Sequence, residues 1–487
     1  MPSRLERSTS AARVAVLDAN APIAPKPTPA DAAVAERAER HRVLVERWKA
    51  IQSAGGREAW IVAELRAKGL LVTTDPKTLS DAERGEYKEK KKLEAAERRA
   101  LLQQAWQAHR ATHVVHVGRV FFRDTDREAN DARDARLARA RENGVDAIDS
   151  VDKLAEGLGL TVPELRWLAY HREASTTSHY RSWTIPKRDG SRRTITAPKR
   201  KLKAAQRWIL RNIVDKLPVH QAAHGFLAGR SIQTNAAMHA GADVVLKIDV
   251  KDFFPTVTYA RVKGLLRQAG LVESVATLAA LIVTESPRDL VSFRGKTLFV
   301  AKGPRALPQG APTSPGITNA ICVRLDRRMS GLARMLGATY TRYADDLAFS
   351  FGRGDASTDE DEGAPRPRPP IGTLLRGARE ILESEGFVVH DKKTTVRRSG
   401  SSQRVTGLVV NRSAETPPGV AAARVPRDVV RRLKAAIWNR EKGRASERHG
   451  ESLEQLKGLA AFVHMTDPKR GRAFLERLSA LERREKG

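Results

Sequence analysis

Two adjacent carboxylates lie in the middle of a pattern that predicts a β-hairpin. Residues 338–343 are rich in β-branched and aromatic side chains, and residues 347–351 resume an apolar alternation. Asp345 and Asp346 fall between these segments, where their negative charges repel each other. One reading is an ordinary acidic turn, because Asp favours turn conformations. The other is a cation site, since Mg²⁺ takes carboxylate oxygens and two such ions can hold a phosphoryl group during its displacement.

A third carboxylate lies upstream, at the end of another predicted strand. Residues 244–248 form a β-branched, apolar run that leads directly into Asp249. Taken alone, Asp249 is simply an acid that terminates a strand. If the two predicted elements lie side by side, Asp249 joins Asp345 and Asp346, and three carboxylates supply oxygen ligands for two Mg²⁺ ions.

The charge balance restricts the class of partner. The chain has 87 Lys and Arg against 57 Asp and Glu, which gives a formal net charge of +30. Its isoelectric point is near 10.6. A positive surplus of this size is typical of proteins that bind nucleic acid.

Other features exclude several protein classes. A single cysteine, Cys322, excludes an intrachain disulfide and any cysteine-rich zinc site, and its surroundings predict a packed helix residue. No apolar run approaches the roughly 20 residues that span a bilayer, and the N-terminus lacks the apolar core of a signal peptide. We therefore expect a cytoplasmic protein without a membrane partner.

The chain is long enough, at 487 residues, for several domains. Residues 1–32 are rich in Ala, Pro and Ser without a period, which predicts disorder. Residues 33–150 show a charge-laced helical pattern and predict a basic, mainly helical N-terminal extension. Residues 352–373 combine an acidic run with several prolines, which indicates a surface loop. Residues 416–487 return to helical spacing.

Three motifs follow one another in a fixed order. They are Ile-Asp-Val-Lys-Asp-Phe-Phe at 248–254, Leu-Pro-Gln-Gly-Ala-Pro-Thr-Ser-Pro at 307–315 and Tyr-Ala-Asp-Asp at 343–346. Together they resemble the ordered palm motifs of reverse transcriptases. The resemblance implies an α+β, right-hand polymerase fold with fingers, a palm of antiparallel sheet and helices, a short helical thumb, and here a helical N-terminal extension. On this basis we expect N-terminal helices and fingers at 151–240, a palm with a fingers insertion and the acidic, proline-rich loop at 241–415, and the thumb at 416–487.

The resemblance also assigns metal ligands and a reaction. Asp249 and Asp345 resemble the main ligands of two Mg²⁺ ions, with Asp346 as the second member of the pair and the Val250 carbonyl as an additional oxygen. The implied reaction is nucleotidyl transfer, in which deoxynucleoside triphosphates (dNTPs) are joined on an RNA template.

Residues for the incoming nucleotide follow from the same motifs. Phe254 resembles the aromatic gate that rejects a ribose 2′-hydroxyl, although a core aromatic beside Phe253 would have the same sequence pattern. Gln309 resembles the glutamine that lines the nucleotide pocket. Lys393 resembles the lysine that protonates the departing pyrophosphate, and Lys392 is the competing choice.

A predicted hairpin at 183–195, with an Asp-Gly turn, resembles the fingers hairpin that closes over the triphosphate. In this hairpin we expect Lys187 and Arg193 to contact phosphate, because cations there stabilise the charge that develops on a transferring phosphoryl group. The sequence does not separate Arg193 from Arg192. Arg230 belongs to the next family motif and is expected in the fingers, near template or nucleotide.

Two short motifs narrow the family. Asn-Ala-Ala-Met-His at 235–239 and Val-Thr-Gly at 405–407 resemble the signatures of retron reverse transcriptases. Without that resemblance, the same residues predict a helix N-cap at Asn235, a satisfied surface histidine at His239, and a plain strand and turn at 405–407. With it, the motifs are implied in recognition of the retron's own RNA. The implied RNA-recognition residues are Asn235, His239, Val405, Thr406 and Gly407.

A retron enzyme would copy a folded noncoding RNA that serves as both template and primer. Synthesis would begin from the 2′-hydroxyl of an internal guanosine and leave a branched RNA–DNA product, msDNA. The family further implies antiphage defence with an effector protein, and the short C-terminal region predicts that a host RNase H removes the RNA. Length and composition resemble the myxobacterial members. The alternatives are a group II intron-like, diversity-generating or abortive-infection reverse transcriptase, or a non-catalytic RNA-binding protein on the same scaffold.

Overall fold

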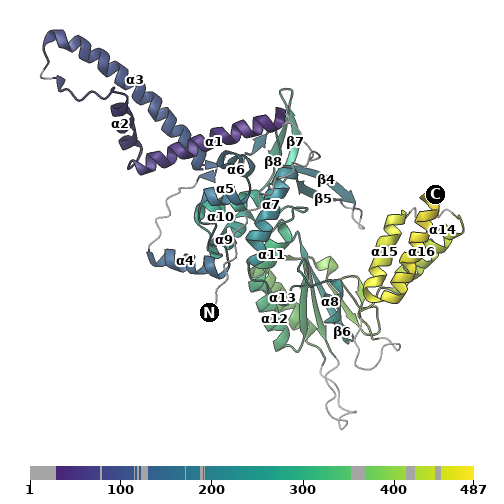
Figure 1. Cartoon of the computed structure of the whole chain (residues 1–487). Helices are drawn as coiled ribbons and strands as arrows, with labels where there is room; N and C mark the ends of the chain where they lie inside the picture. The colour runs from purple at the N-terminus through teal and green to yellow at the C-terminus, as the bar shows by residue number, and fades with distance from the viewer. Residues whose placement is uncertain are drawn as a thin grey trace, which may run out of the picture. The chain divides into compact units, whose positions relative to one another are not determined.

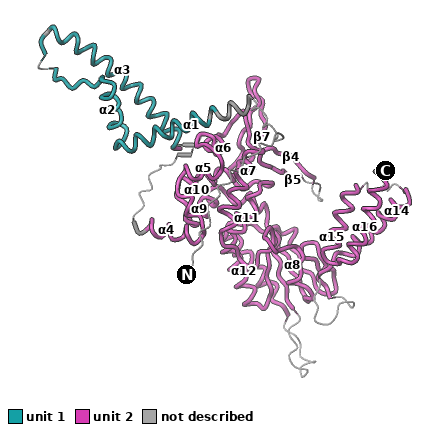
Figure 2. The backbone as a smooth tube through the Cα atoms, viewed as in Figure 1, with its two compact units in different colours: residues 1–112 teal, residues 113–487 magenta. Residues whose placement is uncertain are grey.

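The computed structural model divides the chain into two compact units, residues 1–112 and 113–487 (Figure 1, Figure 2). Among the described helices, none is long and apolar enough to cross a membrane. The structure describes residues 29–76, 79–114, 116–117, 120–121, 130–170, 172–186, 190, 192–352, 368–412, 423–444 and 451–486.

The first unit contains helices α1 (Pro29–Ser53), α2 (Arg57–Ala67) and α3 (Asp81–Thr112). Their apolar positions form a separate small core, as expected for amphipathic helices. Part of the positive charge of these helices is neutralised locally, as in the Lys91–Glu94 ion pair at 2.7 Å. The buried core residues are Ile51, Trp60, Ile61, Leu65, Leu101, Ala105 and Ala108.

A five-stranded antiparallel sheet forms the centre of the second unit. Its strands run in the order β11 (Val388–Val389), β6 (Val244–Lys251), β10 (Asp346–Phe351) and β9 (Thr339–Tyr343), and β12 (Thr395–Arg398) also pairs with β6. On one face, the apolar side chains of these strands enter the main core together with α12 (Val323–Met335) and α13 (Ile371–Ser384). On the opposite face, Val245 and Ala348 belong to a second core.

The region predicted as fingers combines a long hairpin with a small sheet. Strands β4 (Tyr180–Pro186) and β5 (Arg192–Pro198) pair along their whole length. A separate three-stranded sheet has the order β3 (Ala174–Ser175), β8 (Lys296–Ala301) and β7 (Arg288–Phe293).

Helices surround these strands, and each follows a recognisable sequence pattern. Helix α6 begins with a capping box, in which Thr161 accepts from the Glu164 N–H and the Glu164 carboxylate accepts from Thr161. Helix α10 is apolar on all sides and is buried throughout. Cys322 is buried between α11 and α12, as predicted. The helices are α4 (Asn130–Glu142), α5 (Val151–Gly157), α6 (Val162–Ala169), α7 (Arg200–Asn212), α9 (Tyr259–Gln268), α10 (Glu273–Val283) and α11 (Ser314–Ile321).

The C-terminal part consists of a short hairpin and helices that lie side by side (Figure 1). Leu433 and Ile437 are buried, as their helical spacing predicted, and they share the second core with Val245 and Ala348 of the central sheet. The elements are β13 (Arg404–Val405), β14 (Leu408–Val409), α14 (Arg427–Glu441), α15 (Leu453–Thr466) and α16 (Pro468–Lys486). The remaining short elements are β1 (His116–Val117), β2 (Val120–Phe121), α8 (Ile232–Ala237) and the 3₁₀ turns η2 (Val214–Lys216) and η3 (Asp391–Lys393).

The mixture of helices and antiparallel sheets confirms the predicted α+β class. Helix α1 begins at Pro29, so residues 29–32 are helical, and the rest of the predicted disordered segment 1–32 lies outside the described residues. The predicted extension 33–150 spans the boundary between the two units, because Val145 and Ile148 pack into the main core of the second unit. The predicted loop 352–373 lies mainly outside the described residues, and α13 begins at Ile371.

Candidate active site

The structure brings the three predicted carboxylates to one end of the central sheet. Asp346 pairs with Tyr343 across the β9–β10 hairpin, so the turn consists of Ala344 and Asp345 alone. Ala344 has φ of 56°, the left-handed conformation that two-residue hairpin turns of the primed types require. Asp346 also stands directly opposite Asp249 on β6. Cross-strand neighbours lie on the same face of a sheet, so these two carboxylates are adjacent.

Lysines and backbone groups hold this cluster. The Lys393 ammonium lies 3.1 Å from Asp249 Oδ1, and the Lys247 ammonium lies 3.3 Å from Asp346 Oδ2. The Val250 N–H donates to the Asp345 carbonyl at 3.1 Å, which ties the turn to β6. Two of the three carboxylates, those of Asp249 and Asp346, therefore already have a lysine as cationic partner.

Among the described residues, no lysine forms an ion pair with Asp345, and the environment of this carboxyl opposes its ionisation. Burial raises the pKa of Asp345, and the negative charges of Asp346 and Asp249 raise it further, while Arg193 acts in the opposite direction. A buried carboxyl beside two like charges gains more from a bound cation than an exposed one does. Raised carboxyl pKa values of this origin are common at functional sites.

The donor chemistry fits Mg²⁺, which prefers carboxylate and carbonyl oxygens. Asp249, Asp345 and Asp346 would hold the ion or ions, and Val250 lines the same cleft. Among the described residues, no group of three or more His, Cys, Asp or Glu side chains is arranged so that it could hold a metal ion in this structure. Two of the carboxylates point to lysines instead, so the ion pairs with Lys393 and Lys247 have to open before these oxygens can bind a metal.

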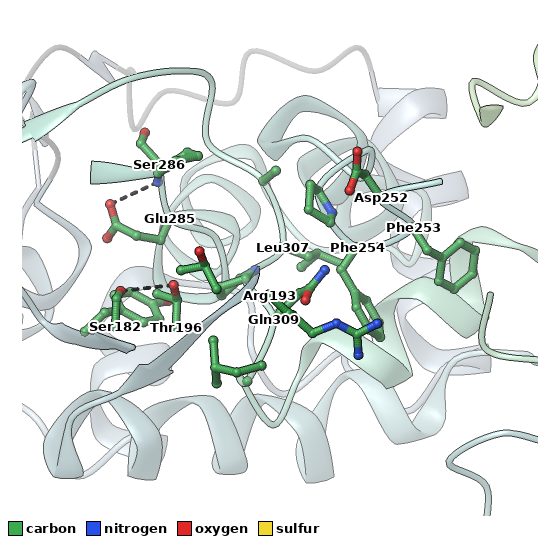
Figure 3. A pocket seen from close by; sticks show the side chains of 18 of the residues that line it. Ser182, Arg193, Thr196, Asp252, Phe253, Phe254, Glu285, Ser286, Leu307 and Gln309 are labelled. Atoms are coloured by element: carbon green, nitrogen blue, oxygen red, sulfur yellow. Dashed lines mark hydrogen bonds between the residues drawn. The ribbon is translucent and has the colours of Figure 1, made fainter. Parts of the chain in front are cut away.

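A cleft of about 910 Å³ opens onto this cluster. Figure 3 shows Arg193, Phe254 and Gln309 among the side chains that line it, and Glu285 and Ser286 line its far side. Asp249, Asp345 and Lys393 also line it. The cleft thus joins residues from the hairpin at 180–198, the central sheet and the loop around Gln309. A volume of this size is in the range of pockets that bind small molecules such as nucleotides.

Arg192 and Arg193, which the sequence could not separate, both line the cleft but differ in their contacts. Arg193 stands opposite Ile185, whereas Arg192 stands opposite Pro186, so their side chains point to opposite faces of the hairpin. Arg192 Nε donates to Thr184 Oγ1 at 3.0 Å, while the charge of Arg193 acts on Asp345. Lys187 lies outside the described residues.

The loop around Gln309 is fixed against the same hairpin. The Thr196 N–H donates to the Gln309 carbonyl at 2.7 Å. Gly310 has φ of 121°, and a Cβ at this position would lie 3.0 Å from Ile195 Cγ2 and 3.1 Å from the Thr196 carbonyl oxygen. A side chain at this position would be crowded by the hairpin, and the backbone conformation is one that residues other than glycine rarely adopt.

The aromatic pair and the lysine pair are placed differently. Phe253 and Phe254 both line the cleft, but Phe253 is buried in the main core, whereas Phe254 is only partly buried. Lys393 reaches Asp249, whereas Lys392 is exposed and is not among the described cleft residues. Arg230 also lies outside that set, and its guanidinium donates to the Gln221 carbonyl at 2.9 Å.

Sequence reasoning missed a buried network behind the turn. Arg342 is fully buried and forms a bidentate ion pair with Asp326, at 2.8 Å from Nε to Oδ1 and 2.7 Å from Nη2 to Oδ2. Its Nη1 donates to Asn319 Oδ1 at 3.0 Å and to the Ala344 carbonyl at 3.3 Å. The hydroxyl of Tyr340 donates to Asp326 Oδ1 at 2.8 Å. A charged residue inside the predicted apolar strand was the available indication, because a buried charge needs a partner.

The retron-like motifs meet at α8, although they are far apart in sequence. The Thr406 hydroxyl donates to the Ile232 carbonyl at 3.0 Å. Thr406 and Gly407 have φ of 47° and 85° and form the turn between β13 and β14, while Val405 is buried. The predicted strand and turn at 405–407 are therefore present, and they sit against the start of the helix that carries the other motif.

Two expectations about the 235–239 motif were wrong. The N-cap of α8 is Ser231, in a capping box with Thr234, so Asn235 lies inside the helix and not at its cap. His239 is satisfied but is not on the surface, because it is only 1% exposed. Its ring packs against the central sheet, with Nδ1 2.7 Å from Ser350 Oγ and Nε2 2.7 Å from Thr341 Oγ1.

Comparison with known proteins agrees with this geometry. Residues 185–411 match the family model for reverse transcriptase (RNA-dependent DNA polymerase). The chain is 57% identical over 458 residues to the retron Mx162 reverse transcriptase of Myxococcus xanthus, which covers 93% of this chain and 92% of that protein. It is 44% identical over 324 residues to the retron Mx65 reverse transcriptase of the same organism, covering 66% of this chain and 70% of that one.

A more distant likeness is to telomerase from Candida albicans, solved with a fragment of telomeric RNA, at 14% identity and a TM-score of 0.34 over 61% of this chain and 56% of that chain. That score is too low to carry an argument. The match to the Mx162 protein extends over nearly the whole chain. The family-model match at residues 185–411 spans the motifs of all three carboxylates. The protein therefore belongs to the retron reverse transcriptases and is an RNA-directed DNA polymerase.

Proposed function

We propose that this protein copies its own structured noncoding RNA into DNA, using the 2′-hydroxyl of an internal guanosine as primer, and leaves a branched RNA–DNA product. The observation that carries the proposal is the meeting of the 235–239 and 405–407 motifs at α8, beside the polymerase sheet.

Asp249, Asp345 and Asp346 hold two Mg²⁺ ions in this proposal, with the Val250 carbonyl as an additional ligand. When bound there, Mg²⁺ would supply activation of the attacking hydroxyl and neutralisation of charge on the phosphates. Arg193 contacts the triphosphate from the fingers hairpin, and Lys187 is proposed to act beside it. Lys393, released from Asp249, protonates the departing pyrophosphate.

Phe254 and Gln309 select and orient the incoming nucleotide in this scheme. Both line the cleft that contains Asp249 and Asp345. The Phe254 ring would lie under the sugar and leave no space for a 2′-hydroxyl. Gln309 would position the base pair from the loop that β5 holds in place.

RNA recognition is assigned to the same two motifs. Gly407 is exposed in its turn and offers backbone groups to a folded RNA, supported by Val405 and Thr406. Asn235 and His239 are each 1% exposed, so they contribute by shaping this surface from within. A cytoplasmic role in antiphage defence, with an effector protein and a host RNase H that trims the RNA, completes the proposal.

The test is to sequence the nucleic acid that copurifies with the wild-type protein and with Asp345→Asn. The proposal predicts one branched RNA–DNA species with the wild type, and the same RNA without attached DNA with the variant. Random DNA, or DNA with no 2′-linked branch, would contradict it.

A further inference from the structure

His239 connects the two strands of the hairpin that carries Asp345 and Asp346. Its Nε2 lies 2.7 Å from the Thr341 hydroxyl on β9, and its Nδ1 lies 2.7 Å from the Ser350 hydroxyl on β10. Thr341 is two residues before Tyr343, where the turn begins. A single ring thus spans both strands close behind the carboxylates.

The connection lies on the face of the sheet that also presents the carboxylates. Thr341 pairs with Ala348 on β10, and Ser350 pairs with Thr339 on β9. Because side chains alternate along a strand, Ala348 and Ser350 share a face with Asp346. A change in the spacing of the strands on this face therefore displaces Asp346 relative to Asp249, its partner on β6.

The imidazole ring of His239 is neutral, and each of its two nitrogens has a hydrogen-bond partner. Burial, together with a smaller effect of the nearby His224, lowers the pKa of His239 to about 4. In a neutral imidazole one nitrogen donates and the other accepts, and a hydroxyl can take either role. Both nitrogens are therefore satisfied by the hairpin, and neither is available to a bound RNA.

The helix that leads to His239 is itself fixed at several points. Ser231 caps it, and Thr234 Oγ1 lies 3.0 Å from His224 Nδ1. Ala236 belongs to the second core, which also contains Ala348 of β10. The Ile232 carbonyl accepts from Thr406. His239 thus extends from an anchored element, as a residue that fixes other residues must.

We infer that His239 is a positioning residue of the polymerase site, which sets the spacing and register of β9 and β10 and so the aim of Asp345 and Asp346, without contacting RNA. The inference rests on the polymerase activity and not on retron-specific priming. It gives the most distinctive residue of the 235–239 motif a role in every round of nucleotide addition.

The test uses a template that carries no retron sequence. His239→Ala is compared with the wild type on poly(rA) primed with oligo(dT), with measurement of kcat, KM for dTTP, the Mg²⁺ concentration for half-maximal rate, and template affinity. A small displacement of reacting groups costs about tenfold to a hundredfold in rate, so we expect a fall in kcat of that size and a higher Mg²⁺ requirement. KM for dTTP and affinity for poly(rA) stay within about twofold, because the cleft residues that contact nucleotide are unchanged and this template carries no retron sequence.

Matched variants distinguish positioning from a general loss of structure. Met335→Ala shortens a side chain at the end of α12 that is 73% exposed, and is expected to leave all four parameters unchanged. His239→Gln, which retains donor and acceptor groups, is expected to restore part of kcat. If His239→Ala does not fold, Thr341→Val and Ser350→Ala each remove one hydrogen bond and are expected to lower kcat with a raised Mg²⁺ requirement.

Two results would overturn the inference. One is a His239→Ala enzyme with normal kcat and Mg²⁺ dependence on poly(rA) but about tenfold weaker binding of the RNA that copurifies with the wild type. That outcome would make His239 an RNA-recognition residue. The other is a variant that unfolds at lower temperature while its folded fraction retains normal kcat, which would make the residue purely structural. Because poly(rA) needs no branched priming, neither result depends on whether the proposed retron chemistry is correct.

Discussion

The two faces of the β9–β10 hairpin, whose turn contains Asp345, are fixed by different kinds of side-chain contact. On one face, Arg342 forms a fully buried ion pair with Asp326 of α12. On the other face, His239 makes two neutral hydrogen bonds to Thr341 and Ser350. Both sets of contacts lie within a few residues of the Ala344–Asp345 turn.

This difference indicates which contacts of the hairpin can be removed without loss of the fold. A buried ion pair is costly to break, because the charge that remains is neither paired nor hydrated. A neutral bridge that loses one partner leaves a hydroxyl unsatisfied, which costs less. The Arg342–Asp326 ion pair, on what we call the charged face, thus attaches the hairpin to the polymerase core. The His239 hydrogen bonds, on the neutral face, attach it to α8 and, through α8, to the turn at Thr406. The following predictions test this contrast.

Asp345→Asn removes the group that both faces hold in place, and has the largest expected effect. We predict that Mg²⁺-dependent DNA synthesis falls by about a thousandfold or more, because a metal ligand is lost, while RNA binding is retained. Primer extension and filter binding measure the two properties. Near-normal extension would contradict the metal assignment.

The same variant should be more stable than the wild type in metal-free buffer at pH 7. The pKa of Asp345 is raised in the folded protein, so its ionised form opposes folding above the pKa of the unfolded chain, about 3.9. The stability difference should shrink as the pH falls toward that value. Thermal unfolding of both proteins at several pH values measures it, and equal midpoints at pH 7 would argue against the electrostatic strain.

Arg342→Met tests the charged face. Loss of the arginine leaves Asp326 buried without its cation, and we expect the free energy of unfolding to fall by about 3–5 kcal/mol. Chemical denaturation measures this change. The double variant Arg342→Met with Asp326→Leu should recover part of the loss, and a single variant as stable as the wild type would show that the pair is not an anchor.

Phe254→Ala leaves both faces of the hairpin intact, and tests the cleft alone. We expect discrimination against ribonucleotides to fall by about tenfold or more, because a few kcal/mol of steric selection is lost. Competition between dNTPs and ribonucleotides in primer extension measures it. Phe253→Ala is the matched control: it removes a core ring, so it should lower stability instead. Unchanged selectivity in the first variant would remove Phe254 from the gate.

Acidification tests the neutral face, with the smallest expected effect. The pKa values of His239 and His224 are lowered to about 4 in the folded protein, by burial in both cases. The unfolded chain binds these protons from about pH 6.5 downward, so stability is lost as the pH falls from there toward 4. Arg342 stays charged throughout this range: burial alone lowers its pKa, but Asp326 raises it above the usual value.

His239→Gln removes the share of this pH dependence that His239 contributes, and leaves the share of His224. The variant should therefore lose less stability than the wild type between pH 6.5 and pH 4. If stability changed with pH identically in the two proteins, protonation of His239 would cost no stability. That result would contradict the proposal that a neutral His239 fixes the two strands.

Much of the site was predictable because its residues lie next to the sequence patterns that predict their secondary structure. Asp249, Asp345 and Asp346 each adjoin a run of β-branched residues, and the run predicts both the strand and the position of the acid at its end. The β4–β5 hairpin and the cap at Thr161 were predictable for the same reason. Motifs in a fixed order then supplied the fold and the family.

The rest depends on partners that lie on other elements. Arg342 finds Asp326 on a helix that precedes its strand, and no periodicity in the sequence joins them. His239 follows a helix of six residues, too short for a pattern that predicts burial. The N-cap of that helix was misplaced because Asn235 is a good capping residue, while Ser231 and Thr234 form the box that fixes the true start.

The central claim is that Asp249 and Asp345 bind the catalytic metal after Lys393 has moved. The most direct measurement is a structure of the protein with an RNA template, a DNA primer, a non-hydrolysable dNTP and Mn²⁺ located by its anomalous scattering. The account predicts metal between the Asp249 and Asp345 carboxylates, with Lys393 released toward the triphosphate. A metal bound elsewhere, with the Lys393–Asp249 ion pair intact, would contradict it.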